Sequence, residues 1–339
     1  MRSRASDPPA TDDAAVSPVT VVQPCKSYTP DMGFAVLFPG QGSQFVGMGA
    51  DVFRARPDLF GESADEILGW SLASLCADGP EEELTRTDRA QPALFAVAYA
   101  LWEALDAATP ATPHGAAGHS LGEYTALAAA GAFDFATGLR LVAARGKAMQ
   151  STANGSPSGM AALIGADEAL ASEIAADRRE AGGALWVANV NAPAQVVLAG
   201  KQDDIRWLIA NARDLGARRA IGLKVASGFH SPLMDEAAAE LSSALDTVVF
   251  SELEFPVWAN YSAESSGHVP TNLRSQLSNT VRFSDSLSAM RTAGIDTFVH
   301  IGPGDVTAGM ARRTVTDAQV YTVSALDDVP DVAAALTVQ

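Results

Sequence analysis

The chain has 339 residues, of which 47% are hydrophobic and 19% charged, as in a globular protein large enough to bury a substantial core. Its formal net charge of −17 argues against broad contact with nucleic acid, because phosphate binding needs clustered lysine and arginine. No stretch of eighteen apolar residues is present, so we expect no membrane contact and a cytoplasmic protein. Cys25 and Cys76 lie far apart, without the spacing of a disulfide framework or a zinc site, so no metal is expected.

Residues 1–32 are rich in Pro, Ala, Ser, Thr and Asp and have no apolar period, which predicts a disordered tail. Order is expected to begin at 34–38, a short apolar run typical of a buried parallel strand. Pro39 and Gly40 end this strand, and the glycines that follow indicate a place where the backbone approaches another group closely.

Apolar spacing predicts a helix from about 85 to 105. Gly118-His119-Ser120-Leu121-Gly122 follows and opens an alanine-rich helix from Ser120, for which Gly131 is a suitable C-terminal cap. Asp134 is then expected to cap a helix that runs to about Gln150.

Residues 160–223 form a self-contained pattern of strand, helix, two strands, helix and strand. This β-α-β-β-α-β order is typical of a ferredoxin-like unit. We therefore predict an α/β protein in which a small ferredoxin-like domain, residues 158–225, is inserted into a large α/β-hydrolase-like domain made of residues 33–157 and 226–335. Further strands of the large domain are expected at 255–258 and 297–301, the latter ending in Gly302-Pro303-Gly304.

The G-x-S-x-G pattern around Ser120 is that of a nucleophilic serine on a strained turn between a strand and a helix. A serine that merely caps the helix is the plainer interpretation. A nucleophile needs a base within hydrogen-bond reach, and the chain has five histidines. His119 is next to Ser120 and should point away from it, and His268 lies in a polar surface turn. His230, on a Gly/Pro-rich segment where the small domain rejoins the large one, is the best candidate, with a structural histidine as its rival.

Seven motifs in one order resemble the malonyl-CoA:acyl carrier protein acyltransferase family, which includes discrete and modular polyketide synthase acyltransferases. The resemblance covers roughly 34 to 330. The motifs are Phe38-Pro39-Gly40-Gln41-Gly42-Ser43-Gln44, Gln91-Pro92-Ala93-Leu94, Gly118 to Tyr124, Arg145-Gly146 with Met149, Asn189 to Gln195, Phe229-His230-Ser231 and Gly302-Pro303-Gly304.

The resemblance implies a nucleophile at Ser120 and a general base at His230, whose ring would be held by the backbone carbonyl of Gln276 instead of an Asp. It also implies that the backbone N–H groups of Gln41 and Leu121 would stabilise the oxyanion. Gln91, Gln276 and Phe229 would support the site.

Arg145 bears on the substrate class. Alone, it is most simply a residue of a solvated helix face or of a salt bridge. At the family's motif position it would hold the free carboxylate of a malonyl group, a contact that suits its planar guanidinium. Leu121 and Phe229 resemble the malonyl-selective members of the family. The Ser227-Gly228 pair departs from the usual His-Ala, which leaves a roomier pocket for methylmalonyl or ethylmalonyl open.

The expected reaction is ping-pong, from a coenzyme A thioester to the phosphopantetheine thiol of an acyl carrier protein, with no cofactor. Because carrier proteins are acidic, a local basic patch is expected, with Arg312, Arg313 and Lys224 as candidates beside an ordinary solvated role. The alternatives are a serine hydrolase, an acyltransferase that moves a preassembled group between carrier proteins, and a scaffold without catalysis. The sequence does not separate fatty-acid from polyketide supply.

Overall fold

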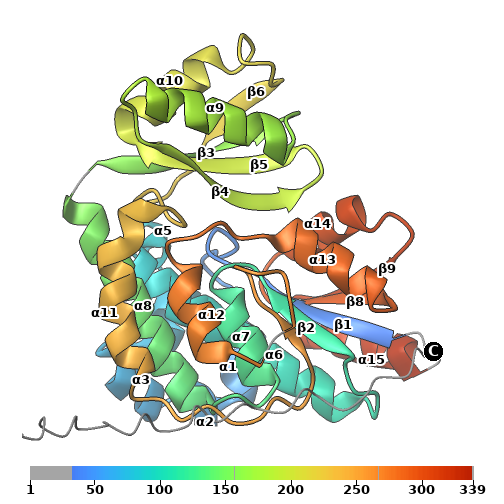
Figure 1. Cartoon of the computed structure of the whole chain (residues 1–339). Helices are drawn as coiled ribbons and strands as arrows, with labels where there is room; N and C mark the ends of the chain where they lie inside the picture. Colours follow the sequence, from blue (N-terminus) through green and yellow to red (C-terminus); the bar gives the residue numbers. More distant parts are fainter. Residues whose placement is uncertain (1–32, 156, 266, 338–339) are drawn as a thin grey trace, which may run out of the picture.

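The computed structural model describes residues 33–155, 157–265 and 267–337. The predicted disordered tail and Cys25 lie outside these residues. Two sheets organise the chain (Figure 1). We call residues 158–222, which build the smaller sheet and its helices, the small unit, and the rest of the described chain the large unit.

The sheet of the large unit has five strands in the order β7-β2-β1-β8-β9, and every pair is parallel. Side chains of β1 alternate between two apolar clusters, with Val36 on one face and Leu37 on the other. Both faces are therefore buried, as an all-parallel sheet requires. The strands are β1 (Gly33–Phe38), β2 (Gly115–Gly118), β7 (Val257–Trp258), β8 (Ile295–Ile301) and β9 (Gln319–Val323).

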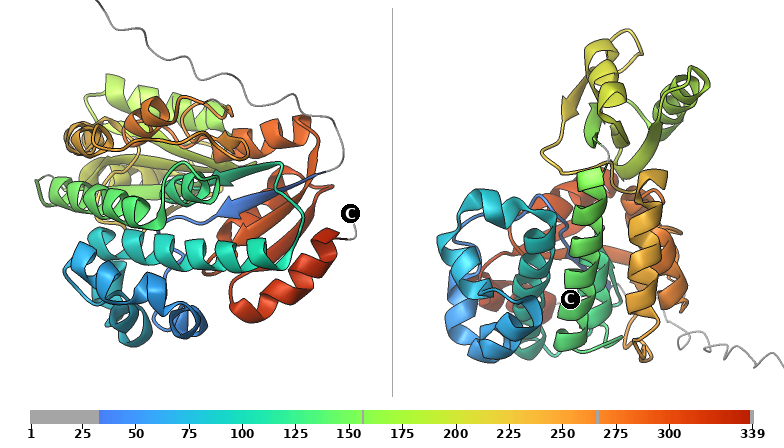
Figure 2. Two further views of the ribbon diagram at one scale, coloured as in Figure 1. Left: turned by 90° about the horizontal axis from the view of Figure 1, so that it is seen from below. Right: turned by 90° about the vertical axis from the view of Figure 1, so that its left-hand side faces the viewer.

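Helices cover both faces of this sheet, as the two views of Figure 2 show. Two long ones, α6 (Thr87–Ala108) and α8 (Phe135–Gly155), pack together beside α7 (Gly122–Ala129). The others are α1 (Ala50–Ala55), α2 (Pro57–Phe60), α3 (Glu62–Leu68), α4 (Leu72–Asp78), α5 (Glu81–Thr85), α11 (Asp235–Leu245), α12 (Val269–Gln276), α13 (Phe283–Thr292), α14 (Val306–Thr314) and α15 (Val329–Thr337).

The small unit has the predicted order β3, α9, β4, β5, α10 and β6. Its sheet is antiparallel, with strand order β4-β5-β3-β6, and α9 and α10 pack on one face of it (Figure 1). The elements are β3 (Ser158–Ile164), α9 (Glu168–Glu180), β4 (Leu185–Ala192), β5 (Gln195–Lys201), α10 (Gln202–Asn211) and β6 (Arg219–Gly222).

The two faces of the small sheet have different neighbours. Along β3, Ala161 and Leu163 belong to the apolar cluster under α9 and α10, whereas Met160 and Ala162 join the main core of the large unit. Because successive strand residues point to opposite faces, the sheet turns one whole face toward the large unit.

The units are also joined through the backbone. Val190 N–H donates to the carbonyl of Val281, and Val281 N–H donates to the carbonyl of Ala188, each over 2.9 Å. Thr280 Oγ1 adds a 2.8 Å hydrogen bond to the carbonyl of Val187. Strand β4 is therefore bound to residues 280–281 of the large unit.

Most predicted elements occur with shifted ends. The helix expected from Ser120 begins at Gly122, because Ser120 itself has a left-handed φ of 53°. Asp134 accepts a hydrogen bond from Thr137 N as a cap should, but α8 continues past Gln150 to Gly155. Gly131, with φ 78°, follows the end of α7 as predicted. No helix among the described residues is long and apolar enough to cross a membrane.

Candidate active site

Ser120 lies on a tight turn between β2 and α7 that only small residues permit. A Cβ at Gly118 would be 1.8 Å from the backbone of Gly122, and a Cβ at Gly122 would be 2.3 Å from the carbonyl oxygen of Phe38. These approaches explain both glycines of the G-x-S-x-G pattern. The positive φ of Ser120 is the strained conformation expected of a nucleophile turn, and not that of a plain helix cap.

Asn260 fixes this turn from the carboxyl end of the neighbouring strand β7. Its side-chain oxygen accepts a 2.7 Å hydrogen bond from Ser120 N, and its Nδ2 donates to the carbonyl of Gly118 over 2.6 Å. Asn260 belongs to none of the motifs that predict the site from the sequence. A polar residue two positions after a strand of a parallel sheet is the signal that could have indicated it.

His230 meets Ser120 as predicted, 110 residues further along the chain. Its Nε2 is 2.7 Å from Ser120 Oγ, and its Nδ1 is 3.0 Å from the carbonyl oxygen of Gln276. Burial, aided by the charge of Arg145, lowers the pKa of His230 to about 3, so the ring is neutral near pH 7. A neutral ring that donates from Nδ1 to a carbonyl accepts at Nε2, and therefore the hydroxyl of Ser120 donates to His230.

Three other histidines, His119, His268 and His300, do not contact Ser120 Oγ. His119 Nε2 lies 2.8 Å from Asn191 Oδ1 on β4, so it points away from Ser120, as predicted. His300 is buried, with its ring nitrogens bonded to Thr307 Oγ1 and the carbonyl of Gly302. His268 is exposed directly before α12, in agreement with a surface position.

Arg145 reaches Ser120 from α8 and is fully buried, which rules out the solvated helix face. Its Nη1 donates to Gln91 Oε1 over 2.8 Å, and its Nη2 donates to Gln276 Oε1 over 2.9 Å and to Ser120 Oγ over 3.0 Å. Within the described ranges, none of the ion pairs involves Arg145, and its Nε–H has no partner. A buried guanidinium held only by neutral groups is a site for an anion.

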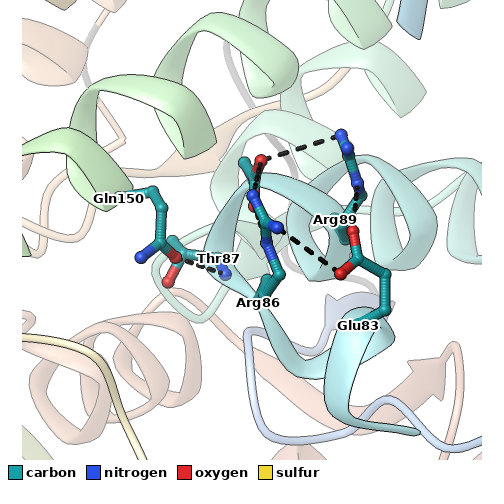
Figure 3. A network of polar contacts seen from close by, with 6 residues as sticks. Glu83, Arg86, Thr87, Arg89 and Gln150 are labelled. Carbon is teal, nitrogen blue, oxygen red and sulfur yellow. Dashed lines mark hydrogen bonds and ion pairs between the residues drawn. The ribbon is translucent and has the colours of Figure 1, made fainter. Parts of the chain in front are cut away.

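Gln41 follows β1, and Leu121 follows Ser120 after the adjacent strand β2, so both peptides lie at the carboxyl edge of the sheet. Gln41 Nε2 donates to Thr87 Oγ1 over 3.3 Å. Thr87 N donates to Gln150 Oε1 of α8 over 3.2 Å, beside ion pairs of Arg86 and Arg89 with Glu83 and Asp88 (Figure 3). The segment after β1 is thus anchored to the start of α6.

A cavity lies between the two units over Ser120 and His230. The large unit lines it with the Gly40–Ser43 segment, and the small sheet lines it with residues of β3, β4 and β5. Phe229 is part of the wall, whereas Ser227 and Gly228 are not among its lining residues. Ser227 Oγ is instead 2.8 Å from Ser158 Oγ, which also accepts from Gly228 N over 3.0 Å. The Ser227-Gly228 pair, on the segment that leaves the small unit, is therefore hydrogen-bonded to Ser158, where the chain enters it.

Fold and site together define a class. A parallel α/β sheet that presents a serine on a strained turn and a histidine at its carboxyl edge is the arrangement of serine enzymes that transfer or hydrolyse acyl groups.

Comparison with known proteins narrows this class. Residues 36–334 match the family model described as "Acyl transferase domain", so the chain belongs to this family and is an acyltransferase. It is 39% identical over 285 residues to the malonyl CoA-acyl carrier protein transacylase of Bacillus subtilis, covering 82% of this chain and 89% of that protein. The Escherichia coli protein of the same name is 38% identical over 309 residues, covering 89% and 98%.

A solved malonyl-transacylase in complex with its holo type II polyketide synthase acyl-carrier protein has a similar fold. The TM-score is 0.83 at 34% identity, and the match covers 88% of this chain and 97% of that one. The family resemblance expected from the ordered motifs is thus confirmed.

Proposed function

We propose that this acyltransferase moves a malonyl group from coenzyme A to the phosphopantetheine thiol of an acyl carrier protein through an ester on Ser120. The names of its relatives support the substrate and the acceptor. The observation that carries the substrate class is Arg145, a buried guanidinium 3.0 Å from Ser120 Oγ that has no carboxylate partner among the described residues. The free carboxylate of a malonyl group supplies that partner.

In the first half-reaction, Ser120 Oγ attacks the thioester carbonyl while its proton passes to His230 Nε2. Peptide N–H groups of Gln41 and Leu121 stabilise the oxyanion, and loss of one such donor typically costs about 100- to 1,000-fold in rate. The C–S bond then breaks, and the thiolate of coenzyme A takes the proton from His230.

In the second half-reaction the phosphopantetheine thiol gives its proton to His230 and attacks the ester carbonyl. The C–O bond to Ser120 then breaks, and Ser120 Oγ takes the proton back from His230. The carbonyl of Gln276 keeps Nδ1 protonated throughout, so no carboxylate is needed behind the ring. Side chains supply the nucleophile, the base and the cation, so the scheme requires neither metal nor redox cofactor.

The carrier protein would approach over the cavity mouth. Lys224 lies between the lining residues Leu223 and Val225, and Arg312 and Arg313 follow the lining residue Met310. All three are exposed, and they could offer local positive charge on a protein whose net charge is −17. We also propose a cytoplasmic location. We further propose a division into a hydrolase-like domain (33–157 and 226–335) and a ferredoxin-like domain (158–225), and the strand order of the small sheet supports the ferredoxin-like part.

A second candidate differs only in the cargo. An alkylmalonyl group shares the free carboxylate that Arg145 would bind, and its α-substituent would have to fit beside Phe229.

Intact mass of the protein mixed with malonyl-, methylmalonyl-, ethylmalonyl- or acetyl-CoA tests the proposal. We expect the increment of one malonyl group, its loss in Ser120→Ala, and its transfer to added holo carrier protein. Release of free malonate at the rate of acylation would instead identify a serine hydrolase. Loading only from an acyl carrier protein, and not from coenzyme A, would identify transfer between carriers.

A further inference from the structure

The side chain and backbone of Gln276 connect three groups of the site. Its carbonyl accepts from His230, and its side-chain Oε1 accepts from Arg145 Nη2 over 2.9 Å. Its Nε2 donates to the carbonyl of Ser120 over 2.9 Å and to Glu123 Oε2 over 2.7 Å. The orientation of this one amide therefore decides whether Arg145 meets an acceptor or a donor.

Glu123 is the group that fixes the amide. It lies on the first turn of α7, is 2% exposed, and its Oε2 also accepts from Asn260 N over 3.0 Å. An ionised carboxylate can only accept hydrogen bonds. Gln276 must therefore turn its NH2 group toward Glu123 and its oxygen toward Arg145.

We propose that Glu123 is a positioning residue for the substrate carboxylate: through the Gln276 amide it holds the Arg145 guanidinium beside Ser120 without pairing with it. This inference rests on the proposed function. Arg145 and Glu123 form the ends of a chain in which a neutral amide separates cation from anion. Before substrate binds, the Gln276 amide and the more distant charge of Glu123 stabilise the Arg145 guanidinium. The carboxylate of the incoming acyl group is then the anion that pairs with Arg145 directly.

A direct pair between Arg145 and Glu123 would have the opposite effect. Substrate would then have to displace a buried carboxylate, and separating a buried pair is costly. The intervening Gln276 avoids this competition. Two other ionisable groups are near Arg145. Tyr124 faces it with its ring at 5.5 Å, and burial raises the pKa of its hydroxyl, so it adds no negative charge near pH 7. His230 is neutral there, because burial lowers its pKa.

Glu123→Gln tests the inference, because glutamine keeps an acceptor for Asn260 N but can also donate. Both orientations of the Gln276 amide then become possible, and Arg145 loses its fixed acceptor. We expect the concentration of malonyl-CoA that half-saturates acylation of Ser120 to rise, and the second-order acylation rate to fall by about 10- to 100-fold. The rate at which phenylmethanesulfonyl fluoride modifies Ser120 should change far less, since this neutral reagent carries no carboxylate for Arg145 to bind.

Gln276→Met is the second variant, because it removes the amide but keeps the backbone carbonyl that holds His230. It should show the same selective loss. Asp204→Asn is the matched control, since Asp204 is a buried carboxylate of the small unit that pairs with Arg178. It should leave both rates at the parental level.

The outcomes separate this inference from the proposed function. If the parent protein takes up no malonyl group, the proposed function fails and the inference with it. If the parent loads malonyl and Glu123→Gln loads it equally well, only the inference is overturned. A parallel loss of malonyl loading and sulfonylation would also overturn it, because Glu123 would then support the serine turn and not the carboxylate site.

Discussion

The two halves of the site are built in different ways. Ser120 and His230 both stand in left-handed backbone, with φ of 53° and 57°, on short turns at the edge of the sheet. Arg145 lies in the middle of a regular helix, and its position is set by side-chain amides that come from distant parts of the chain. Reactivity here depends on strained backbone at Ser120 and His230, whereas selectivity for an acidic cargo depends on the side-chain contacts that place Arg145. The two properties should therefore be separable by mutation.

Removal of the base should have the largest effect and should not discriminate between reagents. His230→Ala is expected to slow malonyl loading and sulfonylation alike by about 100- to 10,000-fold, because both need the hydroxyl proton to be removed. Stopped-flow or quenched-flow acylation followed by intact mass measures this. His268→Ala, which removes an exposed histidine, is the control and should have no effect. Sulfonylation that survived in His230→Ala would show that another group activates Ser120.

Removal of the Arg145 guanidinium should mainly affect malonyl loading and have far less effect on the reactivity of Ser120. Arg145→Ala is expected to reduce malonyl loading by about 100-fold while sulfonylation changes far less, and Arg145→Lys should not restore loading, because an ammonium cannot make the paired contact. Arg140→Ala, an exposed arginine on the same helix, serves as control. Equal loading of malonyl by Arg145→Ala and the parent would contradict the assigned role.

The pH dependences of malonyl loading and of sulfonylation should also differ, by a smaller factor than the effects of these substitutions. Burial raises the pKa of Glu123 to about 7, opposed by the donors Gln276 and Asn260 and by the charge of Arg145, while burial lowers the pKa of His230 to about 3. Protonated Glu123 can donate a hydrogen bond, so malonyl loading should rise as pH increases through about 7.

Sulfonylation should stay nearly constant over the same range, since His230 is neutral throughout. The rise should be absent in Glu123→Gln. Rate constants measured from pH 5.5 to 8.5 in matched buffers test this, and a coincident rise in both reactions would count against the separation of the two halves.

The parts of the fold that the sequence predicts well are those with strong local signals. The small unit shows clear changes of period between strand and helix, and all six of its elements occur in order. Helices α1 to α5 were not predicted, because each has only four to seven residues and none has a side-chain cap. Strand β9 lies at a sheet edge and is half exposed, so its apolar pattern is weak.

The same contrast holds for the site. Ser120 could be predicted because its turn demands small neighbours, and His230 because few histidines compete for the role. Asn260 offered only its place after a strand, and the role of Glu123 had no local signal, because its contact with Gln276 joins residues 153 positions apart. Nothing in the local sequence distinguishes a glutamate that holds an amide in the core from one that faces solvent.

The hydrogen bonds between β4 and residues 280–281 have a consequence for engineering. They attach the small sheet to the large unit at a place distinct from the two chain connections between the units, so any separation of the units would have to break these hydrogen bonds. Smaller side chains at wall positions such as Phe229 and Met160 are therefore the more direct way to enlarge the cavity for bulkier acyl groups.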